Sequence, residues 1–222
     1  MQIDSDIAKR AVMHQDTLPW KASPWTGVQI RTLEGGGEKA ARATAIVRLS
    51  PGASMAGFDA PGEEVMVLDG VLTDGSGNYG KGTYLKNPSG SVQTCESASG
   101  CTLFVKRHHL EPDDDRRIVV ESAAMPWYRG LVDGLSVMPL SEFGTQHTAL
   151  VRWAPGTRFN PHRHYGGEEI YVVDGVFEDE HGRYPAGTWL RSPHLSAHCP
   201  FSIEGCTIFV KTGHLLQEQV AA

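Results

Sequence analysis

The stretch GTRFNPHRHYGGEEIYVVDG, residues 156–175, decides how this chain is interpreted. His162 and His164 stand two residues apart, so on a strand both imidazoles point to the same face. The glycine pair 166–167 can adopt the positive φ that a tight hairpin needs, and such a hairpin returns Glu168, on the neighbouring strand, within reach of the two rings. Two imidazoles and one carboxylate aimed at one point are the outline of a site for a first-row transition metal.

A metal site of this kind needs a further ligand from later in the chain. His198 is the best candidate, and His194 is the competing one. Both lie in the stretch HGRYPAGTWLRSPHLSAH at 181–198. Neutral imidazole and one carboxylate suit Zn, Fe, Ni or Mn, so we expect one divalent transition metal per chain without a preference among these.

The chain contains two copies of one unit. GEEVMVLDGVLTD at 62–74 returns as GEEIYVVDGVFED at 167–179, 105 residues later, and GCTLFVK at 100–106 returns at the same offset. TAIVRLSPG at 44–52 matches TALVRWAPG at an offset of 104, so the first copy has lost one residue in between. A match this long at a nearly constant offset indicates a duplication.

Each copy has the pattern of short strands separated by turns. Runs such as TAIVRL, EEIYVVDG and TIFVK are β-branched or alternating and are bounded by Gly, Pro, Asp and Asn. This spacing predicts an all-β protein built from two antiparallel barrels in tandem, at 1–115 and 116–222. A short helix is expected at 4–13, and 111–122 is expected to link the copies.

The first copy has lost the metal ligands of the second. Where the second copy has NPHRHYGGEE, the first has GFDAPGEE, with Phe58, Asp59 and Ala60 in the segment, and Gln93 stands in place of His198. Only Glu63 survives. One carboxylate and an amide make a poor transition-metal site, so we expect a metal-free first copy that is kept for packing or for a subunit interface. The alternative is a weak site for a hard ion at Asp59 and Glu63.

Composition excludes several classes of function. The net charge of −6 and the pI near 5.9 argue against nucleic-acid binding and against an anionic membrane surface. The N-terminus lacks the apolar core of a signal peptide, and no apolar run reaches the length of a spanning helix, so a cytoplasmic location is expected. The four cysteines are expected to be reduced there, although two pairs, 95 with 101 and 199 with 206, straddle predicted hairpins.

The second copy resembles the cupin superfamily. The first cupin motif, G-x5-H-x-H-x3,4-E-x6-G, is met at every position, by Gly156, His162, His164, Glu168 and Gly175. The second motif is only partly present, and the sequence Y-P-A-G-T-W-L-R-S-P-x-x-S-x-H is similar instead to the cupin subgroup named after the anti-sigma factor ChrR. This resemblance implies a bicupin of two jelly-roll barrels, with His198 as the fourth ligand.

The resemblance implies two kinds of function. One is a non-heme dioxygenase that binds a small carbonyl or enol substrate at Fe(II), as acetylacetone-cleaving enzymes of the subgroup do. The other is a regulatory module that senses reactive oxygen species without turnover. Sigma-factor binding is not expected of this chain alone, because the zinc motif H-x3-C-x2-C of the anti-sigma domain is missing. A structural metal is a third reading.

Two further expectations concern ligands and assembly. Arg191 is a candidate for the mouth of the barrel, where it would bind an anionic substrate, and the alternative is a surface arginine on a strand. A small-molecule ligand and a homodimer are expected, since the edge strands of such barrels often pair.

Overall fold

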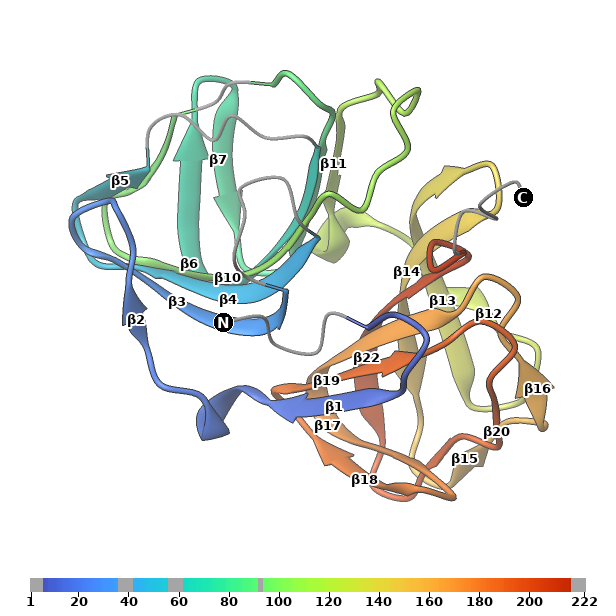
Figure 1. Cartoon of the computed structure of the whole chain (residues 1–222). Helices are drawn as coiled ribbons and strands as arrows, with labels where there is room; N and C mark the ends of the chain where they lie inside the picture. The colour runs from blue at the N-terminus through green and yellow to red at the C-terminus, as the bar shows by residue number, and fades with distance from the viewer. Residues whose placement is uncertain (1–5, 36–41, 56–61, 92–93, 217–222) are drawn as a thin grey trace. The chain divides into compact units, whose positions relative to one another are not determined.

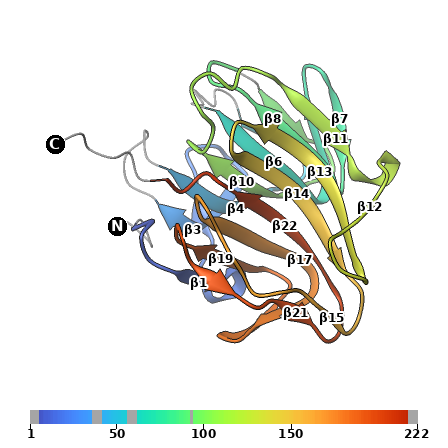
Figure 2. The ribbon, with the colours of Figure 1, turned by 90° about the vertical axis from the view of Figure 1, so that its right-hand side faces the viewer.

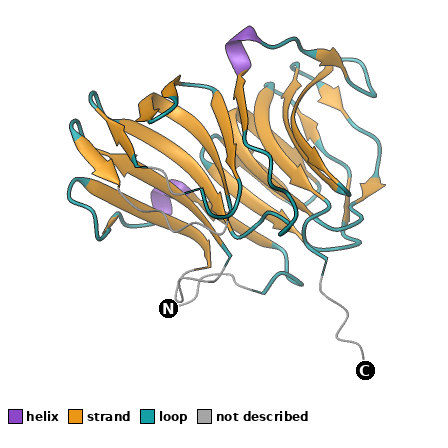
Figure 3. Ribbon diagram, turned by 90° about the horizontal axis from the view of Figure 1, so that it is seen from above, coloured by secondary structure: helices purple, strands orange, loops and turns teal. Residues whose placement is uncertain are grey.

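The computed structural model describes residues 6–35, 42–55, 62–91 and 94–216. Strands dominate this part of the chain, and the helical elements in it are two 3-10 turns (Figure 3). The predicted all-β class is confirmed. In the described ranges no helix is long and apolar enough to span a membrane. The chain divides into two compact units: Gln15–Met125 belong to unit 1, and Asp6–His14 with Pro126–Ala222 form unit 2.

Unit 2 is an antiparallel β structure whose main path of hydrogen-bonded strands runs β1-β19-β17-β22-β14-β13-β12. Figure 2 shows β17, β22, β14 and β13 following one another across this sheet. Strands β15, β18 and β21 pair off the main path, and β16 pairs with β20 alone. The strands are β1 (Ala11–His14), β12 (Tyr128–Arg129), β13 (Leu135–Phe143), β14 (Gln146–Trp153), β15 (Thr157–Arg158), β16 (His162–Arg163), β17 (Glu168–Asp179), β18 (Gly182–Pro185), β19 (Thr188–Ser192), β20 (Ala197–His198), β21 (Phe201–Ser202) and β22 (Cys206–Thr212).

Unit 1 repeats this topology, with the path β11-β8-β6-β10-β4-β3-β2. Its elements are the 3-10 turns η1 (Gln15–Thr17) and η2 (Ser122–Ala124), and the strands β2 (Lys21–Ala22), β3 (Val28–Gly35), β4 (Ala43–Leu49), β5 (Ala53–Met55), β6 (Glu63–Asp74), β7 (Gly77–Gly80), β8 (Thr83–Asn87), β9 (Cys95–Ser97), β10 (Cys101–Arg107) and β11 (Ile118–Glu121). The strands predicted from TAIVRL, EEIYVVDG and TIFVK correspond to β4, β17 and β22, so the predicted strand pattern is confirmed for these runs.

The first strand of each sequence copy lies in the sheet of the other unit. β1 pairs antiparallel with β19, from Ala11 opposite Arg191 to His14 opposite Thr188, and Figure 1 shows the blue β1 beside β19. In unit 1, β11 pairs in the same way with β8. The helix expected at 4–13 is therefore wrong over its described part, because pairing with β19 selects the extended conformation. The expected linker at 111–122 contains a strand. The predicted boundary between 115 and 116 follows the sequence repeat and stays a prediction.

Strand β17 bends so that it pairs in both sheets of the barrel. Its first part pairs with β19 and β22, and from Val176 onward it pairs with β18 and β21. The register with β22 shifts between Val172 and Asp174, just before Gly175, which has φ +72°. A Cβ at Gly175 would meet the carbonyl oxygen of Gly205 at 2.1 Å. Gly175, the last residue of the motif, is therefore the position at which β17 bends. Gly70 has the same geometry in β6.

The core of unit 2 fills the space between its two layers of strands. Alternate residues of β17, such as Ile170 and Val172, are buried there together with residues from the facing strands. The cluster consists of Leu135, Trp153, Ile170, Val172, Phe177, Tyr184, Leu190, Cys206 and Ile208. Because Glu168 lies two residues before Ile170, the same alternation turns its carboxylate toward the interior.

The bend at Gly175 predicts a large loss of stability on substitution. Gly175→Ala should lower the free energy of unfolding by about 2–5 kcal/mol, because the left-handed backbone and the clash with Gly205 both oppose a Cβ. Gly156 is the matched control: its φ is +80°, but a Cβ there meets nothing within 4 Å. Gly156→Ala should cost only about 1–2 kcal/mol. Urea unfolding of both variants measures the difference, and equal losses would contradict this account of the bend.

Candidate metal centre

Four side chains of unit 2 converge at one point. β16 and β20 pair so that His162 lies opposite His198, His164 follows β16, and Glu168 begins β17. One ligand atom from each of these four residues lies within 4.8 Å of the others. The Nε2 atoms of His164 and His198 lie 3.5 and 3.7 Å from Oε2 of Glu168. The structure therefore brings together the four residues that the sequence singled out as ligands.

The donor atoms fit a cation. Nε2 of His164, Nε2 of His198 and Oε2 of Glu168 are buried, and none has a hydrogen-bond partner in the described part of the protein. Buried polar atoms without partners cost free energy, so such a set indicates a group that binds between them. Ligands about 2.0–2.2 Å from a metal such as Zn²⁺ lie roughly 3–3.5 Å from one another, which is close to the spacing found here.

The glycine pair forms a turn, but not the hairpin predicted from the sequence. Gly166 and Gly167 have φ values of +77° and +73°, and the backbone N–H of Gly167 donates to the carbonyl of His164 at 3.2 Å. However, β16 pairs with β20, while β17 pairs with β19 and β22. The turn therefore carries the chain from one sheet to another. A Cβ on Gly166 would meet backbone atoms of Gly213 at 2.6 Å, so the close approach requires glycine.

The second ring nitrogen of two histidines has its own acceptor. Nδ1 of His162 lies 3.0 Å from the carbonyl oxygen of Asn160, and Nδ1 of His198 lies 3.5 Å from Oδ2 of Asp179. When Nδ1 carries the proton and donates to such an acceptor, Nε2 keeps its lone pair for a metal. The rings are also held by aromatic neighbours: Phe159 packs edge-on against His162, with ring centroids 5.0 Å apart.

Burial makes this cluster unfavourable for charge in the absence of a cation. Burial raises the pKa of Glu168 to about 7. Burial, together with the neighbouring histidines, lowers the pKa of His164 to about 3. Burial also works against a charged His198, but the bond to Asp179 and the charge of Glu168 outweigh it and raise the pKa of His198. A bound divalent cation would stabilise the ionised carboxylate and the neutral rings together.

A small cavity adjoins the cluster. It has a volume of about 130 Å³, and His162, Glu168 and His198 form part of its wall. The remaining lining residues are apolar: Leu135, Val151, Trp153, Phe159, Ile170, Phe177, Pro200, Ile208 and Val210. Cavities for drug-sized ligands measure about 300–1,000 Å³. This one has room for a molecule of only a few heavy atoms.

Two other residues predicted for this site lie elsewhere. Arg191 faces the opposite side of the sheet, because it lies across from Glu169 rather than Glu168. It is buried, and its guanidinium donates to the backbone carbonyls of Lys9 and Asp6 at 3.3 and 2.8 Å. Arg191 thus holds the segment before β1 and is not in the wall of the cavity. The competing ligand, His194, accepts the N–H of Gly166 at Nδ1 and is outside the cluster.

One residue that contacts the cluster was not predicted from the sequence. Asp179, at the end of β17, accepts a hydrogen bond from the Tyr184 hydroxyl at 2.7 Å and approaches His198 with its other oxygen. Burial by itself raises the pKa of Asp179, but its hydrogen bonds to His198 and Tyr184 lower that pKa to about 2, so it is an anion. The D-x4-Y spacing occurs in both copies, as Asp74 with Tyr79 and Asp179 with Tyr184, and this signal was available in the sequence.

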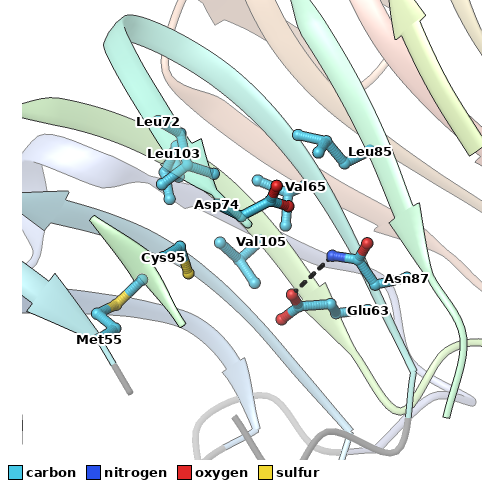
Figure 4. Close-up of a pocket in the computed structure, with 10 residues that line it drawn as sticks. All are labelled: Met55, Glu63, Val65, Leu72, Asp74, Leu85, Asn87, Cys95, Leu103 and Val105. Atoms are coloured by element: carbon cyan, nitrogen blue, oxygen red, sulfur yellow. Dashed lines mark hydrogen bonds between the residues drawn. The ribbon is translucent and has the colours of Figure 1, made fainter. Parts of the chain in front are cut away.

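Unit 1 has a different interior at the same place (Figure 4). Glu63 accepts a hydrogen bond from the Asn87 amide at 3.1 Å, and burial raises the pKa of Glu63. The surrounding wall includes Cys95, whose thiol pKa burial raises to about 12, so it offers no thiolate. The residues that replace the histidines, Phe58, Asp59, Ala60 and Gln93, lie outside the described residues. All four cysteines of the chain are free thiols.

Solved structures with the same fold are similar over nearly the whole chain. A putative dioxygenase from Nostoc punctiforme has a TM-score of 0.78 at 16% identity, covering 96% of this chain and 85% of that one. An oxalate decarboxylase from Lactobacillus farciminis has a TM-score of 0.67 at 12% identity, covering 92% and 86%. A cupin 2 conserved barrel domain protein from Leptotrichia buccalis has a TM-score of 0.64 at 11% identity, covering 96% and 99%. At these identities the likeness shows the fold alone, that of tandem cupin barrels.

The sequence of the chain identifies its family, which the likeness in fold does not. No curated protein matches the chain in sequence. The family model described as ChrR Cupin-like domain matches it twice, over residues 8–111 and 115–216. The two matches together span nearly the whole chain, and they coincide with the duplication found in the sequence. The chain therefore belongs to the ChrR cupin-like family, as a duplicated cupin that carries this domain twice.

Proposed function

We propose that unit 2 binds one divalent transition metal through His162, His164, Glu168 and His198, and that the chain is a non-heme dioxygenase for a small carbonyl or enol substrate. The observation that carries this proposal is the convergence of three buried donor atoms without partners on one point beside a cavity. Three imidazoles and one carboxylate fit Fe, Zn, Ni or Mn. Iron(II) is the metal that would supply dioxygen activation.

The cavity supports a substrate that reaches the ligands directly. Three of the four ligands form part of its wall, so a molecule inside it lies next to the centre. Phe159, Phe177 and Ile208 would exclude water and give the carbon skeleton of the substrate an apolar surface. A purely structural site would instead have a closed shell of protein ligands.

The charge of the cavity wall favours a neutral substrate. Its described lining residues include no lysine or arginine. A dicarboxylate such as oxalate would enter without a cationic side chain to compensate its charge, which is unfavourable in an apolar wall. A neutral β-diketone in its enol form fits better. Its cleavage by one molecule of O₂ breaks a carbon–carbon bond and gives a carboxylic acid and a 2-oxoaldehyde, with one oxygen atom of O₂ entering each product.

Family membership favours a second candidate, a sensory module without turnover. The family model is named for the cupin-like domain of ChrR, and both halves of the chain match it. In that case a ligand or a redox change at the metal would alter unit 2 without consuming a substrate. Homodimer formation, a cytoplasmic location and the absence of a metal in unit 1 also stay predictions.

Metal content is the first test of this proposal. We expect about one metal ion per chain, because the described residues of unit 1 contain no matching group on their own. His162→Ala should abolish the metal, since it removes one of four ligands. Glu63→Ala removes the unit 1 counterpart of Glu168 and should leave the metal content unchanged. Elemental analysis of the purified proteins checks both. Two ions per chain, or loss of metal in Glu63→Ala, would contradict a single centre in unit 2.

Oxygen uptake separates the enzyme from the sensor. The Fe(II)-loaded protein should consume O₂ with a small β-diketone, and Val151→Phe should lower kcat/KM by at least about tenfold, because the larger side chain fills the cavity. The variant should keep its metal, since Val151 is not a ligand. Oxygen electrode traces and elemental analysis give the two readouts. Full metal occupancy without O₂ uptake across a series of neutral diketones would favour the sensor.

A further inference from the structure

Three side chains form a compact polar group at the end of β17, which we call the Asp179 clamp: Arg10, Tyr184 and Asp179. Nη2 of Arg10 donates to the Tyr184 hydroxyl at 2.5 Å and lies 3.4 Å from Oδ2 of Asp179. The Tyr184 hydroxyl in turn donates to Oδ1 of Asp179 at 2.7 Å. The guanidinium of Arg10 also lies over the Tyr184 ring, 5.5 Å from its centroid.

The backbone fixes the carboxylate of this clamp. The N–H groups of His181 and Gly182 donate to Oδ1 of Asp179 at 2.8 and 3.1 Å, which closes the turn between β17 and β18. With the Tyr184 hydroxyl, Oδ1 therefore accepts three hydrogen bonds. The orientation of the carboxylate is thus fixed, and its other oxygen, Oδ2, faces Arg10 on one side and His198 on the other.

Unit 1 contains the same clamp. Nη2 of Arg117 donates to Oδ2 of Asp74 at 2.7 Å and to the Tyr79 hydroxyl at 2.9 Å. The Tyr79 hydroxyl donates to Oδ1 of Asp74 at 2.8 Å. This copy shows that the clamp has a structural role that needs no histidine: it joins the turn after β6 to the segment that leads into β11. Unit 1 is therefore an internal control for any additional role in unit 2.

In unit 2 the clamp also contacts one of the four candidate ligands. Oδ2 of Asp179 lies 3.5 Å from Nδ1 of His198, and both side chains are buried. A histidine that ligates a metal through one nitrogen is usually held by a carboxylate or carbonyl at the other, which sets the tautomer and the ring orientation. The free nitrogen of His198, Nε2, is the one that faces the cluster.

We propose that Arg10 is a positioning residue of the metal centre, which acts through Asp179 on the ring of His198. This inference rests on the proposed metal site and assigns to it a part of the chain far from the ligands in sequence. Arg10 lies in the first of the two family matches, 8–111, yet its segment Asp6–His14 belongs to unit 2. The segment that contains β1 therefore brings the guanidinium of Arg10 to Asp179, in addition to adding a strand beside β19.

The test measures binding of Co²⁺ to the full-length, metal-free protein. Asp179→Asn should weaken Co²⁺ binding about 10- to 100-fold, in the range found for other residues that hold a ligating histidine. Arg10→Ala should weaken it less and should change the visible Co²⁺ spectrum, because the carboxylate is still present but less firmly held. Arg10→Lys should restore part of the affinity. Competition with a chelator gives the dissociation constants.

The matched controls are the same substitutions in unit 1. Asp74→Asn and Arg117→Ala break the corresponding clamp and should lower the melting temperature without changing Co²⁺ affinity or its spectrum. If Arg10→Ala binds Co²⁺ with the affinity and spectrum of the unsubstituted protein, the proposal is wrong, whatever Asp179→Asn does. An equal loss of affinity in the unit 1 variants would also overturn it, because the effect would then be one of general stability.

A measurement without metal separates this inference from the proposed function. At a pH where His198 is neutral, its ring should carry the proton on Nδ1, and the ¹⁵N chemical shifts of the ring report this tautomer. Asp179→Asn should shift the proton distribution, whereas Asp74→Asn should not. Absence of Co²⁺ binding with the expected tautomer would refute the metal site and keep the clamp's action on His198. Metal binding with an unchanged tautomer in Asp179→Asn would refute the clamp's action alone.

Discussion

Strand β17 has to hydrogen-bond in both sheets of unit 2, and the geometry of the site follows from how it does so. Its first residues pair with β19 and β22, its last residues pair with β18 and β21, and Gly175 provides the bend between them. Because alternate residues face the interior, the strand places Glu168 at one end of the same face that Ile170 and Val172 fill with apolar side chains. The strand ends at Asp179, whose Oδ2 lies 3.5 Å from Nδ1 of His198. β17 thus contributes a candidate ligand, part of the apolar core, and the carboxylate that contacts a second candidate ligand.

The two units have the same strand topology although different residues surround the buried glutamate of each. Both have the same strand order, the same bend and the same clamp of arginine, tyrosine and aspartate. They differ around the buried glutamate: unit 2 places three histidines, two of them buried, around Glu168, whereas in unit 1 the Asn87 amide donates to Glu63. A carboxylate that is buried needs either a hydrogen-bond donor or a cation. In unit 1, Glu63 has both the Asn87 amide and the guanidinium of Arg107, whose Nε lies 3.8 Å from Oε2 of Glu63, whereas the donor atoms of unit 2 fit a bound metal cation.

The exchanged strands tie the start of each sequence copy to the other unit. Arg191 holds the carbonyls of the segment before β1, and in unit 1 the buried Lys86 pairs with Asp114 in the segment before β11. These contacts explain why a buried positive charge recurs at the same place in both copies. Arg191, the pocket candidate of the sequence analysis, therefore stabilises the fold by binding the segment before β1.

The sequence by itself determined the duplication, the strand pattern and three of the four residues that converge, because each leaves a local signal. Repeats are visible at a fixed offset, alternation has a period of two, and His162, His164 and Glu168 lie within one short motif. What the sequence could not decide is which distant segments lie side by side. The conformation of residues 11–14 is set by pairing with β19 rather than by their own propensity. The orientation of Arg191 is set by the register between β17 and β19, which places it opposite Glu169 rather than Glu168. The approach of Arg10 to Asp179 likewise depends on a contact across 169 positions of the chain, and such a contact exists only once the tertiary structure has formed.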